Sequence, residues 1–347
     1  MEAPPCQRSD SAATSKTPSG LETLSIHERA RCRPRSRIVV EPLLWTKLQL
    51  ELLGCSFSGP CPAPPAIMKL EYPSDARRRQ TFEAYFTGNR HNDREGAMRC
   101  LMGGIDGPLE TFSDLYFHLG GYRNILLRCS YFCLRDECEG DNPGPVPPVV
   151  AHIDHRYLVW MRELHICRSY SGSIRKIKIR RFASTEPLHE PYLVALLIAL
   201  AQRQWRSLGP EMTKQVSGVK PMVLYTTDDS EFMYLYATNV SSVLIDMFHD
   251  PAVAPTTPQS LPVQITAIAC KPFDTLRDRV MALTPHLTPL GGCITDAALR
   301  QLLVRPGHEG QDMRRNDLSM VHQLDVKPGG RVGPQNAFQG RLAWAGA

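Results

Sequence analysis

One short stretch of the chain concentrates residue types that could perform metal or acid–base chemistry. Residues 152–165, HIDHRYLVWMRELH, place one aspartate, three histidines and one glutamate around an apolar run. Carboxylates bind hard cations such as Mg²⁺, and carboxylates and imidazoles carry protons in hydrolytic sites. The candidate catalytic residues are Asp154, Glu163 and His165, with Glu110 as a further acid from an earlier element.

The apolar residues predict the elements that would position these side chains. They predict two strands, over residues 149–153 and 157–166, joined by a tight turn. Asp154 would then pair with Tyr157, and Glu163 would lie about 20 Å further along the strand. Two carboxylates that far apart cannot share one metal ion. The acids that could complete a site around Glu163 are Glu110, Asp141 and, if the turn is not tight, Asp154.

A second stretch, SIRKIKIRRF over residues 173–182, alternates isoleucine with basic side chains. This alternation predicts an edge strand whose charges discourage pairing with another sheet, which is the interpretation we favour. The alternative is a face that contacts nucleic acid phosphates, although no stacking platform of aromatic side chains accompanies it. The basic residues concerned are Arg175, Lys176, Lys178, Arg180 and Arg181.

Three cysteines, Cys129, Cys133 and Cys138, raise the question of zinc. Structural zinc sites usually use C-x2–4-C pairs, and often two such pairs. On one strand Cys129 and Cys133 would share a face but lie about 13 Å apart. The spacing therefore favours core cysteines over a zinc site.

The order of the predicted elements indicates the fold class. Capping residues, apolar stripes and glycine stops predict helices over residues 74–88, 92–104 and 108–121. Later elements follow in this order: strands over 124–135, 149–153 and 157–166, a helix apolar on all sides over 190–204, two strands around the TTDDS turn, a helix over 241–248, a strand over 263–273 and a helix that Asp274 caps. This order predicts an α+β (mixed α/β) fold with a central sheet of about five to seven strands, N-terminal helices and one buried helix.

Composition sets the limits of the domain and its setting. The 347 residues include 42% hydrophobic and 22% charged residues, which is typical of globular proteins. Proline-, serine- and glycine-rich ends predict a mostly disordered extension over 1–67, a single globular domain over 68–300 and a mostly disordered tail over 301–347. Eleven cysteines without a secretory signal indicate a reduced, cytoplasmic or nuclear setting. The longest apolar run, ten residues, is too short to cross a membrane, so we expect a soluble protein.

Two resemblances add expectations to this reading. The segments PYLVALLIALAQ, VLYT and YATNVSSVLIDMF resemble a group of uncharacterised fungal proteins, and the likeness runs from about Met68 to about residue 285. It implies no activity. More faintly, the order of elements resembles PD-(D/E)XK nuclease-like proteins, in which a helix with an acid precedes a strand, a strand with Asp, a strand with E-x-K, a helix and a strand.

The nuclease resemblance implies matching positions in this chain. Glu110 would stand for the acid on the helix, Asp154 for the aspartate and Glu163 for the glutamate. Mg²⁺ held between such carboxylates would activate a water against a phosphodiester. The chain departs from the pattern because His165 stands where the family has lysine and no proline precedes Asp154.

Two hypotheses for the function follow. The first is a soluble intracellular binding or interaction protein with an unknown protein or nucleic acid partner and no cofactor. The second is a degenerate metal-dependent nuclease that would use Glu163 and His165, with Glu110 or Asp154 as a further acid and Mg²⁺ as its cofactor. The net charge of +5 is too mild to require a nucleic acid partner by itself.

Overall fold

The fold is seen in a computed structural model of the whole chain. The structure describes residues 23–32, 40–65, 82–88, 90, 93–103, 109–120, 124–135, 147–183 and 186–284. The chain divides into two units, Met1–Cys293 and Ile294–Ala347, and every described residue belongs to the first. The tail expected over 301–347 therefore lies outside the described residues.

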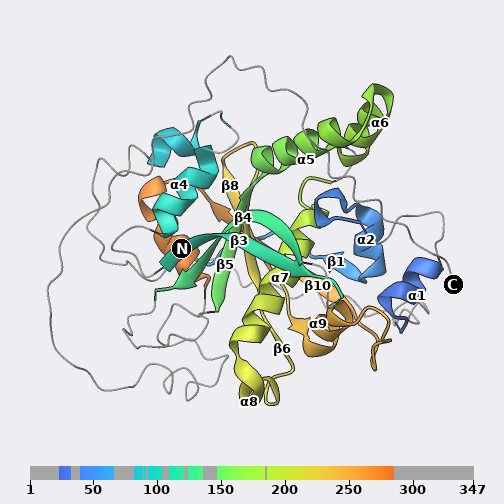
Figure 1. Cartoon of the computed structure of the whole chain (residues 1–347). Helices are drawn as coiled ribbons and strands as arrows, with labels where there is room; N and C mark the ends of the chain where they lie inside the picture. Colours follow the sequence, from blue (N-terminus) through green and yellow to red (C-terminus); the bar gives the residue numbers. More distant parts are fainter. Residues whose placement is uncertain are drawn as a thin grey trace, which may run out of the picture. The chain divides into compact units, whose positions relative to one another are not determined.

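Helices and strands are interleaved along the chain (Figure 1). The helices are α1 (Ile26–Arg31), α2 (Lys47–Leu52), α4 (Asp93–Met102), α5 (His155–Ser169), α6 (Gly172–Ala183), α7 (Pro191–Ser207), α8 (Gly209–Thr213), α9 (Ser242–His249) and α10 (Leu276–Ala282), with 3₁₀ turns η1 (Pro42–Leu44) and η2 (Phe273–Thr275). The strands are β1 (Cys55–Phe57), β2 (Cys61–Pro62), β3 (Leu109–His118), β4 (Asn124–Leu134), β5 (Pro148–Asp154), β6 (Gly218–Val219), β7 (Met222–Thr226), β8 (Phe232–Ala237), β9 (Val240–Ser241) and β10 (Leu261–Ala269). Among the described helices, none combines the length and apolar character that crossing a bilayer requires.

A mixed sheet forms the centre of the described unit. Its strands follow the order β1–β10–β8–β7–β5–β4–β3, with β2 also paired to β10, which gives eight strands. β3, β4 and β5 form an antiparallel meander, whereas β7 lies parallel to β5. A parallel neighbour needs a long crossover, and α5, α6 and α7 provide it. The predicted α+β class with a mixed central sheet is confirmed.

Helices cover both faces of this sheet with separate cores. One core joins α7, α5, α9 and α2 to residues of β3, β4, β5, β7 and β10. The other joins α4, α10 and residues 82–86 to the opposite face. The predicted buried helix is confirmed as α7, because Leu193–Ala201 have no exposed surface. Glu190 caps this helix by accepting a hydrogen bond from the Tyr192 amide, and Pro191 occupies the first turn.

The helix expected over residues 108–121 is wrong, because residues 109–118 form strand β3. The β3–β4 pairing shifts register after Phe112, where it steps from Phe112–Tyr131 to Asp114–Arg128, so the extra residue of this β-bulge lies on β4. Beyond the bulge, Leu115 and Phe117 alternate with exposed residues as a strand requires. At this register shift Phe112 and Leu115, three residues apart, pack against the same core, a spacing that imitates a helix.

The strand expected over residues 157–166 is also wrong, because helix α5 occupies this stretch. Its buried residues Leu158, Met161 and Ile166 follow the helical spacing of three to five positions. The Asp154 side chain caps the helix and so ends the preceding strand. A short apolar run does not distinguish a strand from a helix, and here capping decided the outcome.

The edge strand expected over residues 173–182 is instead helix α6. Isoleucines at positions 174, 177 and 179 satisfy both a strand's alternation and a loose helical spacing, so the pattern alone was ambiguous. Residues 174–182 pack mainly on α5, and the Phe182 ring lies under the Arg162 guanidinium at 4.6 Å.

The expected domain start at Met68 needs correction, because earlier residues belong to the same core. Cys55–Phe57 pair with β10 as strand β1. Trp45, Leu50 and Leu53 are buried in the core that contains α7. Of the extension expected over 1–67, the described parts therefore form elements of the domain.

Candidate functional site

A group of polar side chains is buried between α4 and the sheet. We call it the buried polar cluster, and each member is at most 5% exposed. Its members are Arg94 and Glu95 on α4, Ser130 on β4, His152 and Asp154 on β5, and Thr226 on β7.

Sheet register brings the strand members together. Ser130 pairs with His152 on the neighbouring strand, and Asp154 pairs with Thr226. His152 and Asp154 are two residues apart, so their side chains point to the same face. That face is the one that α4 covers, which places Glu95 directly above the strands.

Glu95 is the centre of the cluster. Its Oε2 accepts a hydrogen bond from Ser130 Oγ at 2.8 Å and lies 3.3 Å from His152 Nδ1. Its Oε1 accepts a hydrogen bond from the Asp154 amide at 2.7 Å. Burial by itself raises the pKa of Glu95. The charge and hydrogen bond of His152 and the hydrogen bonds from Ser130 and Asp154 lower it by more, so the pKa lies below its ordinary value. Glu95 is therefore a carboxylate held in its charged form.

Asp154 joins the cluster to the start of α5. Its Oδ1 accepts hydrogen bonds from the Arg156 and Tyr157 amides at 2.9 and 3.3 Å, which caps the helix. Its Oδ2 accepts a hydrogen bond from Thr226 Oγ1 at 2.8 Å and lies 3.4 Å from Arg94 Nη1. Both carboxylate oxygens are thus engaged within the protein.

Arg94 links the cluster to the turn between β7 and β8. Its Nε donates to the Phe86 carbonyl at 3.0 Å, and its Nη2 donates to the Asp228 carbonyl at 3.2 Å. It also donates to the Thr227 carbonyl and to Ser230 Oγ. Arg94 therefore fixes this turn, in which Ser230 has a positive φ of 56°.

A partly exposed histidine lies beside the cluster at the same end of the sheet. His155 Nδ1 is 2.6 Å from Tyr225 Oη, and His155 Nε2 is 3.7 Å from Asp228 Oδ2. Burial raises the pKa of Tyr225 well above its ordinary value, so its hydroxyl keeps its proton. Tyr225 has no exposed surface, so a substrate could not reach its hydroxyl.

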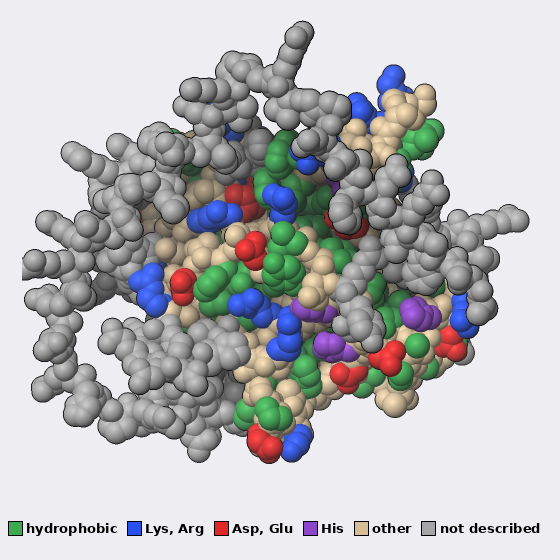
Figure 2. All heavy atoms as spheres, viewed as in Figure 1, with side chains coloured by type: hydrophobic (Ala, Val, Ile, Leu, Met, Phe, Trp, Pro, Cys, Tyr) green, Lys and Arg blue, Asp and Glu red, His purple; other side chains and the backbone are tan. Residues whose placement is uncertain are grey.

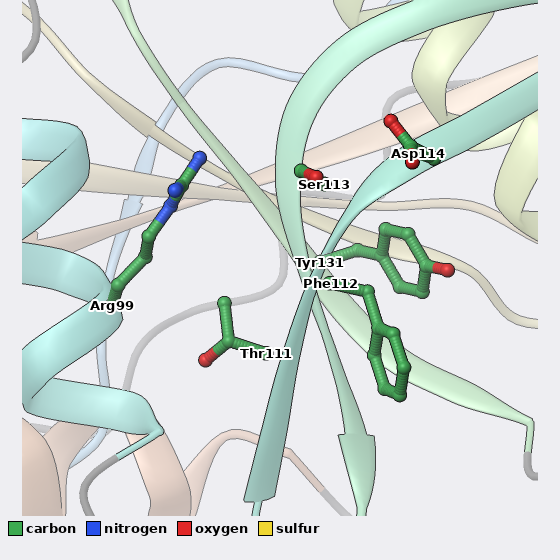
Figure 3. Close-up of a pocket in the computed structure, with 6 residues that line it drawn as sticks. All are labelled: Arg99, Thr111, Phe112, Ser113, Asp114 and Tyr131. Carbon is green, nitrogen blue, oxygen red and sulfur yellow. The ribbon is translucent and has the colours of Figure 1, made fainter. Parts of the chain in front are cut away.

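A small cavity opens at the β3–β4 edge next to the cluster. It measures about 250 Å³ and is lined by Arg99, Thr111, Phe112, Ser113, Asp114 and Tyr131 (Figure 3). Arg99 extends from α4, and its Nε donates a hydrogen bond to Ser130 Oγ at 2.8 Å. The cavity lies just below the usual size of small-molecule sites, about 300–1,000 Å³. Its connection to Glu95 runs through Arg99 and Ser130, which close the cluster on this side.

The donor set does not fit the magnesium ion that the nuclease resemblance implies. Mg²⁺ needs an octahedral shell that includes carboxylate oxygens. Glu95 and Asp154 use their oxygens for internal hydrogen bonds, and His152 lies against Glu95. Within the described ranges, no three His, Cys, Asp or Glu side chains come together in a way that could hold a metal ion.

The structure separates the residues that the sequence nominated for catalysis. Asp154 belongs to the buried polar cluster, whereas Glu163 is exposed on α5, about 14 Å further along the helix axis at 1.5 Å per residue. His165 Nδ1 lies 3.7 Å from Glu41 Oε2. Glu110 is exposed on β3. Asp141, the other acid considered, lies outside the described residues.

Sequence reasoning missed Glu95, which is the acid that the fold places next to Asp154. The helix over Asp93–Met102 was predicted, but its glutamate was not singled out. Alternation along 149–154 could have shown that His152 and Asp154 share a face. Their neighbour on α4 depends on how the helix packs, which no local pattern reveals.

The two cysteines of β4 are core residues, as their spacing favoured. Cys129 and Cys133 are buried at 3% and 2% exposure. Burial raises the pKa of the Cys133 thiol to about 11. Cys138, the third residue of the zinc alternative, lies outside the described residues.

The predicted basic residues lie on α6, and the four whose side chains the structure describes divide into two groups. Arg175 donates to the Cys167 carbonyl at 3.1 Å, and Lys178 Nζ lies 4.2 Å from the centre of the Tyr170 ring. Lys176 and Arg180 are exposed. The fifth is Arg181, whose side chain the structure does not describe.

Ile174 and Ile177 are exposed on the same helix, at 48% and 68%. In Figure 2, hydrophobic and basic side chains meet at the upper right, where Figure 1 places α6. No protein-family model matches the chain, and no curated protein sequence matches it.

Proposed function

We propose that this protein is a non-enzymatic binding protein that holds an anionic partner on helix α6. The observation that carries the proposal is the charge of that helix: five basic residues within Gly172–Ala183 and no acidic residue. Lys176 and Arg180 are exposed, and neither forms an ion pair within the part of the chain that the structure describes. Unpaired surface cations attract anions and accelerate their association.

The buried polar cluster supports a structural role beside this surface. Its carboxylates are satisfied by internal hydrogen bonds, and at most 5% of any member is exposed. A buried hydrogen-bond network of this kind rigidifies a fold, and here it joins α4, three strands and the start of α5. The crossover that carries α6 is thereby fixed at its first residue.

The test is charge reversal on α6 with a matched control. The double variant Lys176→Glu/Arg180→Glu should lose salt-dependent binding to fluorescent polyglutamate, measured by anisotropy. The control Lys220→Glu/Lys271→Glu changes the net charge equally on exposed residues outside the α5–α6 crossover, and it should retain binding. Equal loss in both variants would show a general charge effect, and the proposal would then fail.

A metal-dependent nuclease is the second candidate, and only the order of the elements favours it, since the buried carboxylates do not fit the metal ion. The order of elements resembles that of PD-(D/E)XK proteins: helix α4, then strands β3, β4 and β5, then the α5–α7 crossover and strand β7. As in that pattern, the last strand, β7, lies parallel to β5. In this alignment Glu95, rather than Glu110, is the acid on the first helix. Mg²⁺- or Mn²⁺-dependent cleavage of DNA or RNA that disappears in Glu95→Gln but persists in Glu163→Gln would favour the nuclease over the binding protein.

The proposal places this binding protein in the cytoplasm or nucleus, in keeping with its odd number of cysteines, eleven. Membership of the fungal group remains a prediction from the quoted segments. No cofactor is part of the proposed binding function.

A further inference from the structure

The outward face of α6 combines apolar and basic side chains. At about 100° per residue, Ser173, Ile177 and Arg180 fall on one side of the helix, with Ile174 and Lys176 at its two flanks. Ile177 is 68% exposed and Ile174 is 48% exposed, and both appear among the few large hydrophobic side chains that are exposed in the described chain.

The opposite face of α6 packs on α5, and two cation–π contacts lie on this side. The Phe182 ring lies under the Arg162 guanidinium, and the Tyr170 ring lies under the Lys178 ammonium. Both rings thus already have a cation of the same chain against one face. The isoleucines and the two exposed cations remain available to a partner.

This combination favours a protein over a nucleic acid. Nucleic acid binding surfaces pair cations with hydrogen-bonding side chains or with open aromatic rings on which bases stack. Isoleucine offers neither, and a hydrated phosphate backbone does not bury it. Apolar side chains of a protein partner would bury Ile174 and Ile177, whose contact with water is unfavourable.

We infer that α6 docks an acidic segment of another protein that also carries aliphatic or aromatic side chains. The carboxylates of that segment would pair with Lys176 and Arg180, and its apolar side chains would cover Ile174 and Ile177. Charge complementarity selects the acidic partner, because α6 contains no acid of its own. This inference rests on the proposed anion-binding function and names the class of partner.

The experiment separates the apolar from the charged contribution. The probes are a synthetic helical peptide of glutamate and leucine, with leucines at helical spacing, the same peptide with serine for leucine, and an oligo-dT strand. Ile174→Ser/Ile177→Ser should weaken binding of the leucine peptide by about tenfold or more and leave binding of the serine peptide unchanged. Lys176→Glu/Arg180→Glu should weaken binding of both peptides. Because both isoleucines are exposed, urea unfolding should show that the serine variant retains its fold.

Each other outcome has a distinct meaning. If the wild-type chain binds none of the anionic probes, the proposed function itself fails. If it binds both peptides equally and the isoleucine changes have no effect, anion binding stands and the acidic–apolar partner is overturned. Tighter binding of oligo-dT that does not depend on the isoleucines would assign the surface to nucleic acid. A self-association that sedimentation detects and that Ile174→Ser/Ile177→Ser removes would assign the surface to a second copy, and would also overturn the inference.

Discussion

Replacing Glu95 with alanine should destabilise the fold strongly, because this carboxylate holds three buried partners. The substitution removes the acceptor of the Asp154 amide and of the Ser130 hydroxyl, and the carboxylate beside His152. Ser130 can redirect its hydroxyl, but the Asp154 amide is fixed by the β5 backbone. That amide would remain buried without a partner.

The expected loss can be estimated from these contacts. An unsatisfied buried amide costs about 1–3 kcal/mol, and breaking a buried charged network costs about 3–5 kcal/mol. We therefore expect Glu95→Ala to lower the free energy of unfolding by about 3–5 kcal/mol, a large part of the about 5–15 kcal/mol of a typical domain. Glu95→Gln keeps one oxygen for the Asp154 amide, and should cost about 1–3 kcal/mol.

Urea unfolding followed by far-ultraviolet circular dichroism measures this change, and a similar m-value in each variant confirms that the same surface unfolds. Glu163→Ala is the control, because Glu163 is exposed on α5 and its loss should change stability by less than about 0.5 kcal/mol. If Glu95→Ala costs no more than Glu163→Ala, the cluster does not hold α4 on the sheet, and the reasoning is refuted.

The same residue should make the fold sensitive to acid. The pKa of Glu95 lies below its ordinary value of 4.5 in the folded chain, so its stabilising effect is fully present above that value. As the pH falls below 4.5 and through the lower folded pKa, the carboxylate takes up a proton and this contribution is lost. Glu95→Gln should flatten this part of the stability profile, whereas an unchanged slope would contradict the charged state assigned to Glu95.

Three further predictions concern other parts of the fold. Arg162→Ala should lower the free energy of unfolding in urea by about 3–5 kcal/mol, because it leaves the Glu190 carboxylate, its bidentate partner, buried and without its cation. A loss below about 1 kcal/mol would contradict that pairing. Gly218→Ala should lower stability by about 1–3 kcal/mol, since its Cβ would lie 2.4 Å from a backbone carbonyl oxygen of β9; unchanged thermal unfolding would show that the strands separate freely. Cys133 should react with iodoacetamide far more slowly than exposed Cys100, because burial raises the pKa of Cys133 to about 11; peptide mass spectrometry that finds equal labelling would show that β4 opens readily.

Local sequence was a good guide wherever one element carried its own signals. The run of apolar residues over 190–204, with Glu190 and Pro191 at its start, specified the buried helix α7. The TTDDS turn between two apolar runs specified the β7–β8 hairpin. In both cases the cap or turn residue and the apolar pattern agree, so no tertiary contact was needed to decide between alternatives.

Local sequence misled where one pattern fits two structures. The register shift between β3 and β4 accompanies helical spacing in a strand, and the isoleucines of α6 produced strand alternation in a helix. In α5 the aspartate that resembled a catalytic acid at a turn is the cap of a helix. Hydrophobic period alone cannot separate these cases, because it records which side chains are buried and not which backbone hydrogen bonds form.

The sequence by itself determined the mixed fold class, the buried helix and the basic character of residues 173–182, because composition and local hydrogen bonding fix these properties. Only the tertiary structure decided which acids meet. Packing of α4 on the sheet placed Glu95 against His152 and Asp154 and left Glu163 on the surface. The physical reason is that residues about 60 positions apart come together through the register of β4, β5 and β7, which depends on the whole sheet.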